Sequence, residues 1–341
     1  MEQRLQPAEA DTAENSTAKS TRELRQPIPR WALGLSLGLN ALLLALWMAD
    51  RSGRLPRDGN AASSAAPAPA ANSAEVAKSE LDPEWLLEQV NPGAGFELPV
   101  RYGDLGPRLV QAGAIDPDRF VQAYREAGRP LTRDQLTTLL SGSDLPVVID
   151  SGSSHFLLNF FWALGLVNRS VLLEDGPLMA YSQGDIGRFA STGGWTLGAR
   201  PATELYSSAN ILELTPQQQE LVERVASQVY RPCCDNHAAF PDCNHGMAML
   251  GLLQLLASQG ASEGQMREAA KYANSFWFPQ QAMEMAAFFF LTQGLTYEQV
   301  APSETVGREN FSGTGFNDLH RWLADNGLLQ EAPRQGGNCS V

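Results

Sequence analysis

The feature that most constrains this chain is a run of nineteen residues without a charged side chain, WALGLSLGLNALLLALWMA, at residues 31–49. As an α-helix the run would be about 28 Å long, close to the thickness of the hydrocarbon core of a bilayer. Tryptophans near its two ends, Trp31 and Trp47, suit the membrane–water interfaces. The run is longer than the apolar part of a signal peptide, and no clear A-x-A cleavage pattern follows it. We therefore expect one uncleaved transmembrane helix.

The segments that flank this run predict how the rest of the chain is organised. Residues 1–30 are polar and mixed in charge, which is typical of a disordered tail. Residues 50–80 contain an Ala/Pro/Ser-rich stretch that cannot pack and would serve as a linker. Basic residues are nearly balanced across the span, so its orientation rests on the linker, which favours an exported body. We expect a single-pass protein of a bacterial-type inner membrane with a periplasmic domain at residues 81–330 and a flexible tail at 331–341.

Charge and small residues restrict the partners. The net charge is −13, and nearly all of the acidic excess follows residue 82. An acidic domain repels the phosphate backbones of nucleic acids, so we expect no nucleic-acid binding. Its charge is better suited to a basic or membrane-embedded protein partner. The bilayer itself is the partner of residues 31–49. Gly34 and Gly38 share one face of the span and would allow two helices to approach as a homodimer.

Start signals for helices recur through the body. Asp82 and Asp116 each precede a proline, and Thr132, Ser262 and Thr296 each precede a glutamine three residues later, the pattern of a capping box. Strands are expected only at residues 146–150 and 210–214. The prediction is a mainly α fold: a single-pass transmembrane helix plus a multi-helix globular domain with few or no strands. This domain has one core, or two that meet near residue 142.

The strongest candidate site is RPCCDNHAAFPDCNHGMAML at residues 231–250. Two short thiolate–imidazole pairs, Cys234 with His237 and Cys243 with His245, would form the S₂N₂ set that suits tetrahedral zinc. The following helix is expected to begin near His245 with Asp242 as its cap, which places Cys243 where a helix terminus favours the thiolate.

Two further donors extend this set. Cys233 precedes Cys234 directly, and Met249 shares a helix face with His245, so both are candidate substitute ligands. Four protein ligands around zinc would make the site structural, whereas copper, which accepts the thioether, would indicate metal handling or electron transfer. The predicted function is metal binding, metal handling or redox chemistry by a membrane-anchored domain.

Two other interpretations stay open for the same residues. In a disulfide-stapled interaction module of a membrane complex, Cys233 or Cys234 would be bonded to Cys243. In a thiol-dependent enzyme, Cys243 would be the nucleophile and His237 or His245 its base.

A second motif, PVVIDSGSSHF at residues 146–156, resembles the active-site loop of pepsin-like aspartic proteases at Asp150-Ser151-Gly152. That family pairs two such loops so that two carboxylates share a proton, and this chain has only one. We interpret the motif as the start of a helix, with Gly152 turning the chain and Ser153 or Ser154 as the N-cap.

Overall fold

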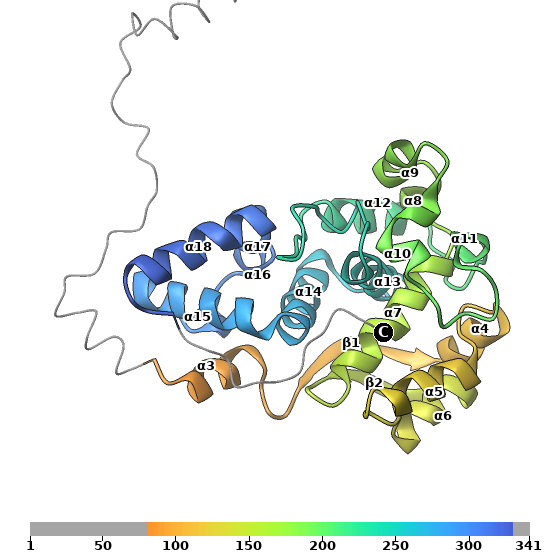
Figure 1. The fold of residues 1–341 in the computed structure, drawn as a ribbon, viewed down its shortest axis with the longest axis horizontal. Coiled ribbons are helices and arrows are strands. Elements are labelled where there is room, and N and C mark those ends of the chain that lie inside the picture. Colours follow the sequence, from red (N-terminus) through yellow and green to blue (C-terminus); the bar gives the residue numbers. More distant parts are fainter. Residues whose placement is uncertain (1–80, 330–341) are drawn as a thin grey trace, which may run out of the picture. The chain divides into compact units, whose positions relative to one another are not determined.

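The computed structural model describes residues 81–329, and Figure 1 shows that they are mainly helical with a single two-stranded sheet. The predicted mainly α class with few strands is therefore confirmed. Within residues 81–329, no helix is both long and apolar enough to cross a membrane. The expected N-terminal tail, the span with Gly34 and Gly38, the linker and the C-terminal tail lie outside the described residues.

The first elements surround the sheet. They are α3 (Pro83–Val90), β1 (Phe96–Gly103), α4 (Leu105–Gln111), α5 (Pro117–Glu126), α6 (Arg133–Ser141) and β2 (Ser143–Ile149). β1 pairs with β2 in the antiparallel sense, with Phe96 opposite Ile149 and Leu98 opposite Val147, and the register shifts after Leu98. The strand predicted at residues 146–150 is thus confirmed as β2. β1 was not predicted, because Pro99 interrupts its alternating pattern and is accommodated at the irregularity.

The strand predicted at residues 210–214 is wrong. Only Ala209 forms a bridge, to Asn168. The backbone N–H of Leu212 donates instead to the buried Asn168 side chain at 2.7 Å. A side chain, not a neighbouring strand, therefore pairs with the backbone N–H of Leu212.

Helices make up the remainder. The elements after β2 are α7 (Ser154–Val167), α8 (Val171–Glu174), α9 (Pro177–Ser182), η1 (Ile186–Arg188), α10 (Ala190–Gly193), α11 (Ala202–Leu205) and α12 (Pro216–Ala226). They are followed by α13 (Asn244–Ser258), α14 (Glu263–Trp277), α15 (Pro279–Gln293), η2 (Tyr297–Gln299), α16 (Pro302–Thr305), α17 (Arg308–Phe311) and α18 (Gly313–Asp325).

The predicted helix starts are confirmed at the level of single hydrogen bonds. The carboxylates of Asp82 and Asp116 accept backbone N–H groups of the first turns of α3 and α5. The three predicted capping boxes are formed, at Thr132, Ser262 and Thr296. These signals are local, so sequence alone determines them.

The Asp150-Ser151-Gly152 turn starts a helix, as we interpreted it. Oδ1 of Asp150 accepts the backbone N–H groups of Gly152 and Ser153 at 2.8 and 2.6 Å. Ser153 is the N-cap residue of α7, although its hydroxyl donates to Val148 O instead of capping the helix. The turn therefore joins β2 to α7.

The core is centred on the packing of α7 against α13 (Figure 1). Gly165 and Gly251 let the two backbones meet: a Cβ atom on Gly165 would lie 2.1 Å from Met247 O, and one on Gly251 would lie 2.3 Å from Phe161 O. One hydrophobic cluster contains residues from both sides of position 142, such as Leu139 and Val147, so the described residues share one core. This core fixes α13, and the candidate site lies at the N-terminal end of that helix.

Candidate metal centre

The cysteine-rich segment forms a loop that leads into α13. Cys233 and Cys234 lie in its first turn, and Cys243 is the N-cap of α13, with its sulfur 3.4 Å from the backbone N of Gly246. The helix therefore begins at Asn244, one residue before the predicted start, and the predicted cap Asp242 is wrong. The carboxylate of Asp242 instead accepts hydrogen bonds from the side chains of Arg231 at 2.6 Å and Asn236 at 2.8 Å, and the Cys243 sulfur takes the capping position.

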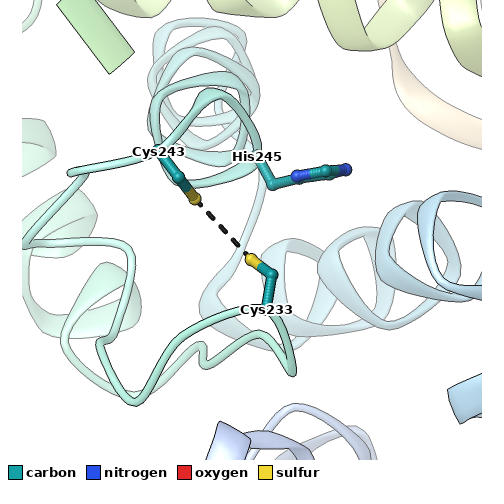
Figure 2. A group of neighbouring side chains, drawn as sticks. All are labelled: Cys233, Cys243 and His245. Carbon is teal, nitrogen blue, oxygen red and sulfur yellow. Dashed lines mark hydrogen bonds between the residues drawn. The ribbon is translucent and has the colours of Figure 1, made fainter. Parts of the chain in front are cut away.

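Three sulfur atoms meet at this loop. The Sγ–Sγ distances are 3.5 Å from Cys233 to Cys234, 3.7 Å from Cys233 to Cys243 and 3.8 Å from Cys234 to Cys243. All three cysteines are free thiols, since a disulfide would place two sulfurs about 2.05 Å apart. Figure 2 shows the Cys233 and Cys243 thiols pointing toward each other. We call these three side chains the sulfur triad.

Two further donors adjoin the sulfur triad. His245 brings a ring nitrogen into a group with the Cys233 and Cys243 sulfurs, all within 4.8 Å of one another. A carboxylate oxygen of Asp242 belongs to a second such group with Cys234 and Cys243. Both groups share Cys243, which makes it the central donor of the site.

The His245 ring is held by its packing. Its side chain is buried, with the ring centroid 4.4 Å from that of Phe278. Within the described part of the chain, its Nδ1 atom has no hydrogen-bond partner. A buried ring nitrogen without a partner is costly in a protein interior, and a metal bond is one way to satisfy it.

Two of the sequence-predicted ligands lie outside both groups. His237 belongs to neither group. Its backbone forms a single antiparallel β-bridge with that of Tyr230, and the two side-chain rings have their centroids 5.7 Å apart. Burial, followed by the charge of Arg231, lowers the pKa of His237, which keeps the ring neutral. Met249 is also in neither group and is buried in α13. The structure thus brings together Cys233, Cys234, Cys243 and His245.

Arg231 organises the loop from within. Its side chain is only 2% exposed, and its guanidinium donates to Cys243 Sγ at 3.1 Å and to Asp242 Oδ1 at 2.6 Å. The same group donates to the carbonyl oxygens of Asn236 at 3.0 Å and Phe240 at 3.1 Å. One cation therefore joins both cysteine turns of the loop. We did not predict this role, which depends on contacts up to twelve residues away.

Gly246 makes room for this guanidinium. A Cβ atom at position 246 would lie 2.6 Å from Nη2 of Arg231 and 2.7 Å from its Cζ. The glycine in Asn-His-Gly is therefore required by the arginine in Arg-Pro-Cys-Cys, fifteen positions earlier in the sequence.

The protonation of the triad is uneven. Hydrogen bonds to Cys234 and Cys243 raise the pKa of the Cys233 thiol. Hydrogen bonds from Cys233 and Cys234, helped by the charge of Arg231, hold the pKa of Cys243 well below its usual range. Of the three thiols, Cys243 is therefore the one that its surroundings favour as the thiolate. A bound cation would take the place of the protons of the other two thiols.

The loop is also fixed from its outer side. The carboxylate of Asp235 accepts the backbone N–H of Thr314 at 2.8 Å and its hydroxyl at 2.7 Å. The carbonyl oxygen of Cys234 accepts the backbone N–H of Gly313 at 3.1 Å. The cysteine pair is thereby tied to the first turn of α18, about 80 residues further along the chain.

A cavity of about 580 Å³ opens beside the triad. The sulfur triad, Asp242, Asn244 and His245 form one part of its wall; the remainder comes from Trp162, Ala190, Gly194 and Thr196. Trp162 is held in place because its indole N–H donates to Ser191 O at 2.6 Å. These wall residues were not predicted, because nothing in the local sequence links α7 and α10 to the cysteine loop.

The arrangement therefore offers two overlapping groups of three donors that share Cys243, and their sulfur, imidazole and carboxylate atoms are able to hold a transition-metal ion. Comparison of the chain with protein-family models, with curated proteins and with solved structures found no match in any of the three.

Proposed function

We propose that this protein binds one transition-metal ion, zinc, through the thiolates of Cys233, Cys234 and Cys243 and the imidazole of His245. The observation that carries the proposal is the spacing of the sulfur triad. Zinc–sulfur bonds of about 2.3 Å in tetrahedral geometry place two sulfurs about 3.8 Å apart. The Sγ–Sγ distances of 3.5, 3.7 and 3.8 Å match this edge without any movement of the backbone.

Charge supports a divalent ion in this place. Three thiolates around a divalent cation leave a net charge of −1, and the buried Arg231 guanidinium lies 3.1 Å from the Cys243 sulfur to balance it. A hydrogen bond of this kind to a ligating atom fixes its orientation and tunes the metal. Three sulfurs and one nitrogen form one of the usual ligand sets of zinc, whereas copper(I) would make less use of the imidazole.

The membrane context is part of the proposal. The apolar run at residues 31–49 would anchor the domain, the linker would hold it on the exported side, and its acidic surface would face a basic partner. Deletion of residues 31–49 should move the protein from the membrane fraction to the soluble fraction. Recovery of the intact protein from membranes by a high-salt wash alone would contradict the anchor.

Metal analysis of the purified full-length protein tests the metal site. We expect about one zinc ion per chain, and none in Cys243→Ser. His245→Ala should weaken zinc binding by about 100-fold or more, because a direct ligand counts for at least as much as a partner of a ligand. His237→Ala should retain the ion. His320→Ala is the matched control, since this half-exposed histidine is bonded to Glu284 in another part of the molecule.

The same preparation separates the competing functions. One equivalent of copper instead of zinc would keep the site but assign it to metal handling or electron transfer. No metal and the loss of two free thiols would favour the disulfide staple. The thiol-dependent enzyme has one specific observation in its favour, the lowered pKa of Cys243 beside His245. No metal, no disulfide and rapid alkylation of Cys243 would support that function.

A further inference from the structure

The cavity beside the sulfur triad gives the proposed metal centre an open side. Zinc sites with a purely structural role are closed by four protein ligands, and those that act on other molecules keep a position for an exogenous ligand. Here all four ligand side chains line one cavity of about 580 Å³. This volume lies within the range typical of small-molecule sites, roughly 300 to 1,000 Å³.

The rest of the cavity wall, from Trp162, Ala190, Gly194 and Thr196, is fixed by its own contacts. Trp162 is held by its hydrogen bond to Ser191 O and by edge-to-face packing on Trp195, with ring centroids 5.0 Å apart. Ala190 and Gly194 carry little or no side chain, and a Cβ atom on Gly194 would lie 2.4 Å from Ala190 O. This part of the wall is therefore one fixed indole ring beside two residues with little or no side chain, and it is mostly apolar, which is typical of a ligand pocket.

The charges around the cavity restrict what enters it. Besides the thiols, the ionisable groups in its wall are Asp242 and His245. The nearest strong cation, Arg231, does not line the cavity, and its guanidinium is already bonded to Cys243 and Asp242. A divalent ion with three thiolates carries a charge of −1 and Asp242 adds another, while Arg231 supplies a single positive charge to both, so the net negative charge disfavours an anionic ligand.

We propose that this cavity binds a small neutral molecule that coordinates the metal through a nitrogen or sulfur atom, as a fifth ligand or in exchange with His245. The inference rests on the proposed metal site. Neutral nitrogen and sulfur donors are those that a zinc or copper ion in a thiolate-rich site accepts most readily. An imidazole ring is the simplest such molecule: one nitrogen binds the ion, and its N–H can donate to an oxygen of the cavity wall, such as the Thr196 hydroxyl.

The test uses the full-length protein loaded with Co²⁺, a visible-light-absorbing substitute for zinc, and titrated with imidazole. We expect a saturable change in the absorption bands of the bound cobalt, with the cobalt still retained on dialysis. Acetate and phosphate at the same concentrations should leave the spectrum unchanged.

A cavity-filling variant links this response to the pocket. Ala190→Leu should weaken imidazole binding at least about tenfold with the cobalt stoichiometry unchanged, because Ala190 lines the cavity, so that a larger side chain reduces its volume, and is not one of the metal ligands. Ala301→Leu is the control, since Ala301 is an exposed alanine that precedes another short helix, α16.

The outcomes separate the two proposals. Cobalt bound one to one with a spectrum that imidazole does not change would leave the metal site standing and overturn the open cavity. Equal imidazole affinity in Ala190→Leu and the unmodified protein would also overturn it, as would an equal response to acetate. Failure to bind cobalt at all would overturn both.

Discussion

Two cations are buried to the same extent in this molecule, and their surroundings differ. Arg231 and Lys271 are each 2% exposed. The guanidinium of Arg231 lies against anionic or ionisable groups, the Asp242 carboxylate and the Cys243 sulfur. The ammonium of Lys271 lies among neutral groups, donating to the carbonyl oxygens of three residues: Tyr297 at 2.6 Å, Val300 at 2.9 Å and Glu298 at 3.3 Å.

The two environments move the pKa values in opposite directions. Burial alone would lower the pKa of Arg231, but the charge of the Cys243 sulfur, which accepts its hydrogen bond, raises it above its usual value. Burial lowers the pKa of Lys271 to about 8, and the more distant carboxylates of Glu268 and Glu298 offset this only in part. A buried cation among anions indicates a place where negative groups converge, as in a functional site. A buried cation among carbonyls indicates a structural link, here between α14 and the segment from η2 to α16.

The largest expected effect comes from removing the guanidinium. Arg231→Met should lower the free energy of unfolding of the metal-free protein by about 4 kcal/mol, because the partly buried Asp242 carboxylate, the Cys243 sulfur and two carbonyl oxygens lose their buried cationic donor. It should also weaken metal binding by about 10- to 100-fold, because Cys243 loses a hydrogen bond. Urea unfolding and competition with a chelator measure the two effects.

Arg224→Met is the matched control, since its side chain is 51% exposed in an ion pair with Glu263. Arg224→Met should lower the free energy of unfolding by less than about 1 kcal/mol and leave metal binding unchanged. Equal effects of the two variants would remove the distinction between a buried organising cation and a surface one.

The second variant tests the structural cation. Lys271→Met should lower the free energy of unfolding by about 3 kcal/mol, because the apolar side chain leaves three carbonyl oxygens, two of them in buried hydrogen bonds, without their shared donor. Metal binding should stay unchanged within error, because Lys271 contacts neither the sulfur triad nor its loop. A loss of metal affinity in the folded Lys271→Met protein would show that the two buried cations act on one site.

A smaller effect is expected from crowding the guanidinium without removing it. Gly246→Ala places a carbon 2.6 Å from Nη2 of Arg231, so the guanidinium must shift and lose some of its hydrogen bonds. We expect a loss of about 2 kcal/mol in unfolding free energy and a weaker metal site.

Gly264→Ala provides the control for this change. Gly264 also lies in the first turn of a helix, α14, but a Cβ atom there would have nothing within 4 Å. It should raise the unfolding free energy by about 0.4 to 1 kcal/mol. If Gly246→Ala lowered the unfolding free energy no more than Gly264→Ala does, the guanidinium of Arg231 would not be fixed in the position that the structure gives it.

The part of the fold that sequence predicts is the part determined by neighbours along the chain. The capping boxes at Thr132 and Ser262 depend on residues three positions apart, and both are formed. Cys234, Cys243 and His245 could be proposed as a site because eleven positions separate the first from the last.

What sequence did not predict depends on distant contacts. Arg231 was passed over because an arginine beside a cysteine pair gives no sign that it is buried. The cavity wall at Trp162 and Ala190 belongs to helices that only tertiary packing brings to the loop. His237 fitted a ligand spacing, but the turn directs it to Tyr230 instead. Spacing along a loop does not determine which way each side chain points.

The smallest expected effect is a dependence on pH that separates the two cations. The pKa of Lys271 falls from an ordinary 10.5 to about 8 on folding. Between these values the unfolded chain keeps the proton that the folded chain has lost, so the free energy of unfolding rises with pH. The difference in stability between the unmodified protein and Lys271→Met should therefore be constant below pH 8 and widen above it.

Urea unfolding of both proteins from pH 7 to 9.5 measures this difference, in a range that ends below the ordinary tyrosine pKa of 10 and the raised values of Tyr272 and Tyr297. Arg224→Met should show a constant difference over the same range, because a guanidinium does not titrate there. A constant difference for Lys271→Met as well would mean that the ammonium keeps its charge among the carbonyls. In that case three carbonyl groups would stabilise a buried cation as strongly as the Cys243 sulfur and the Asp242 carboxylate stabilise Arg231. Anionic surroundings would then no longer distinguish the candidate site from a structural link.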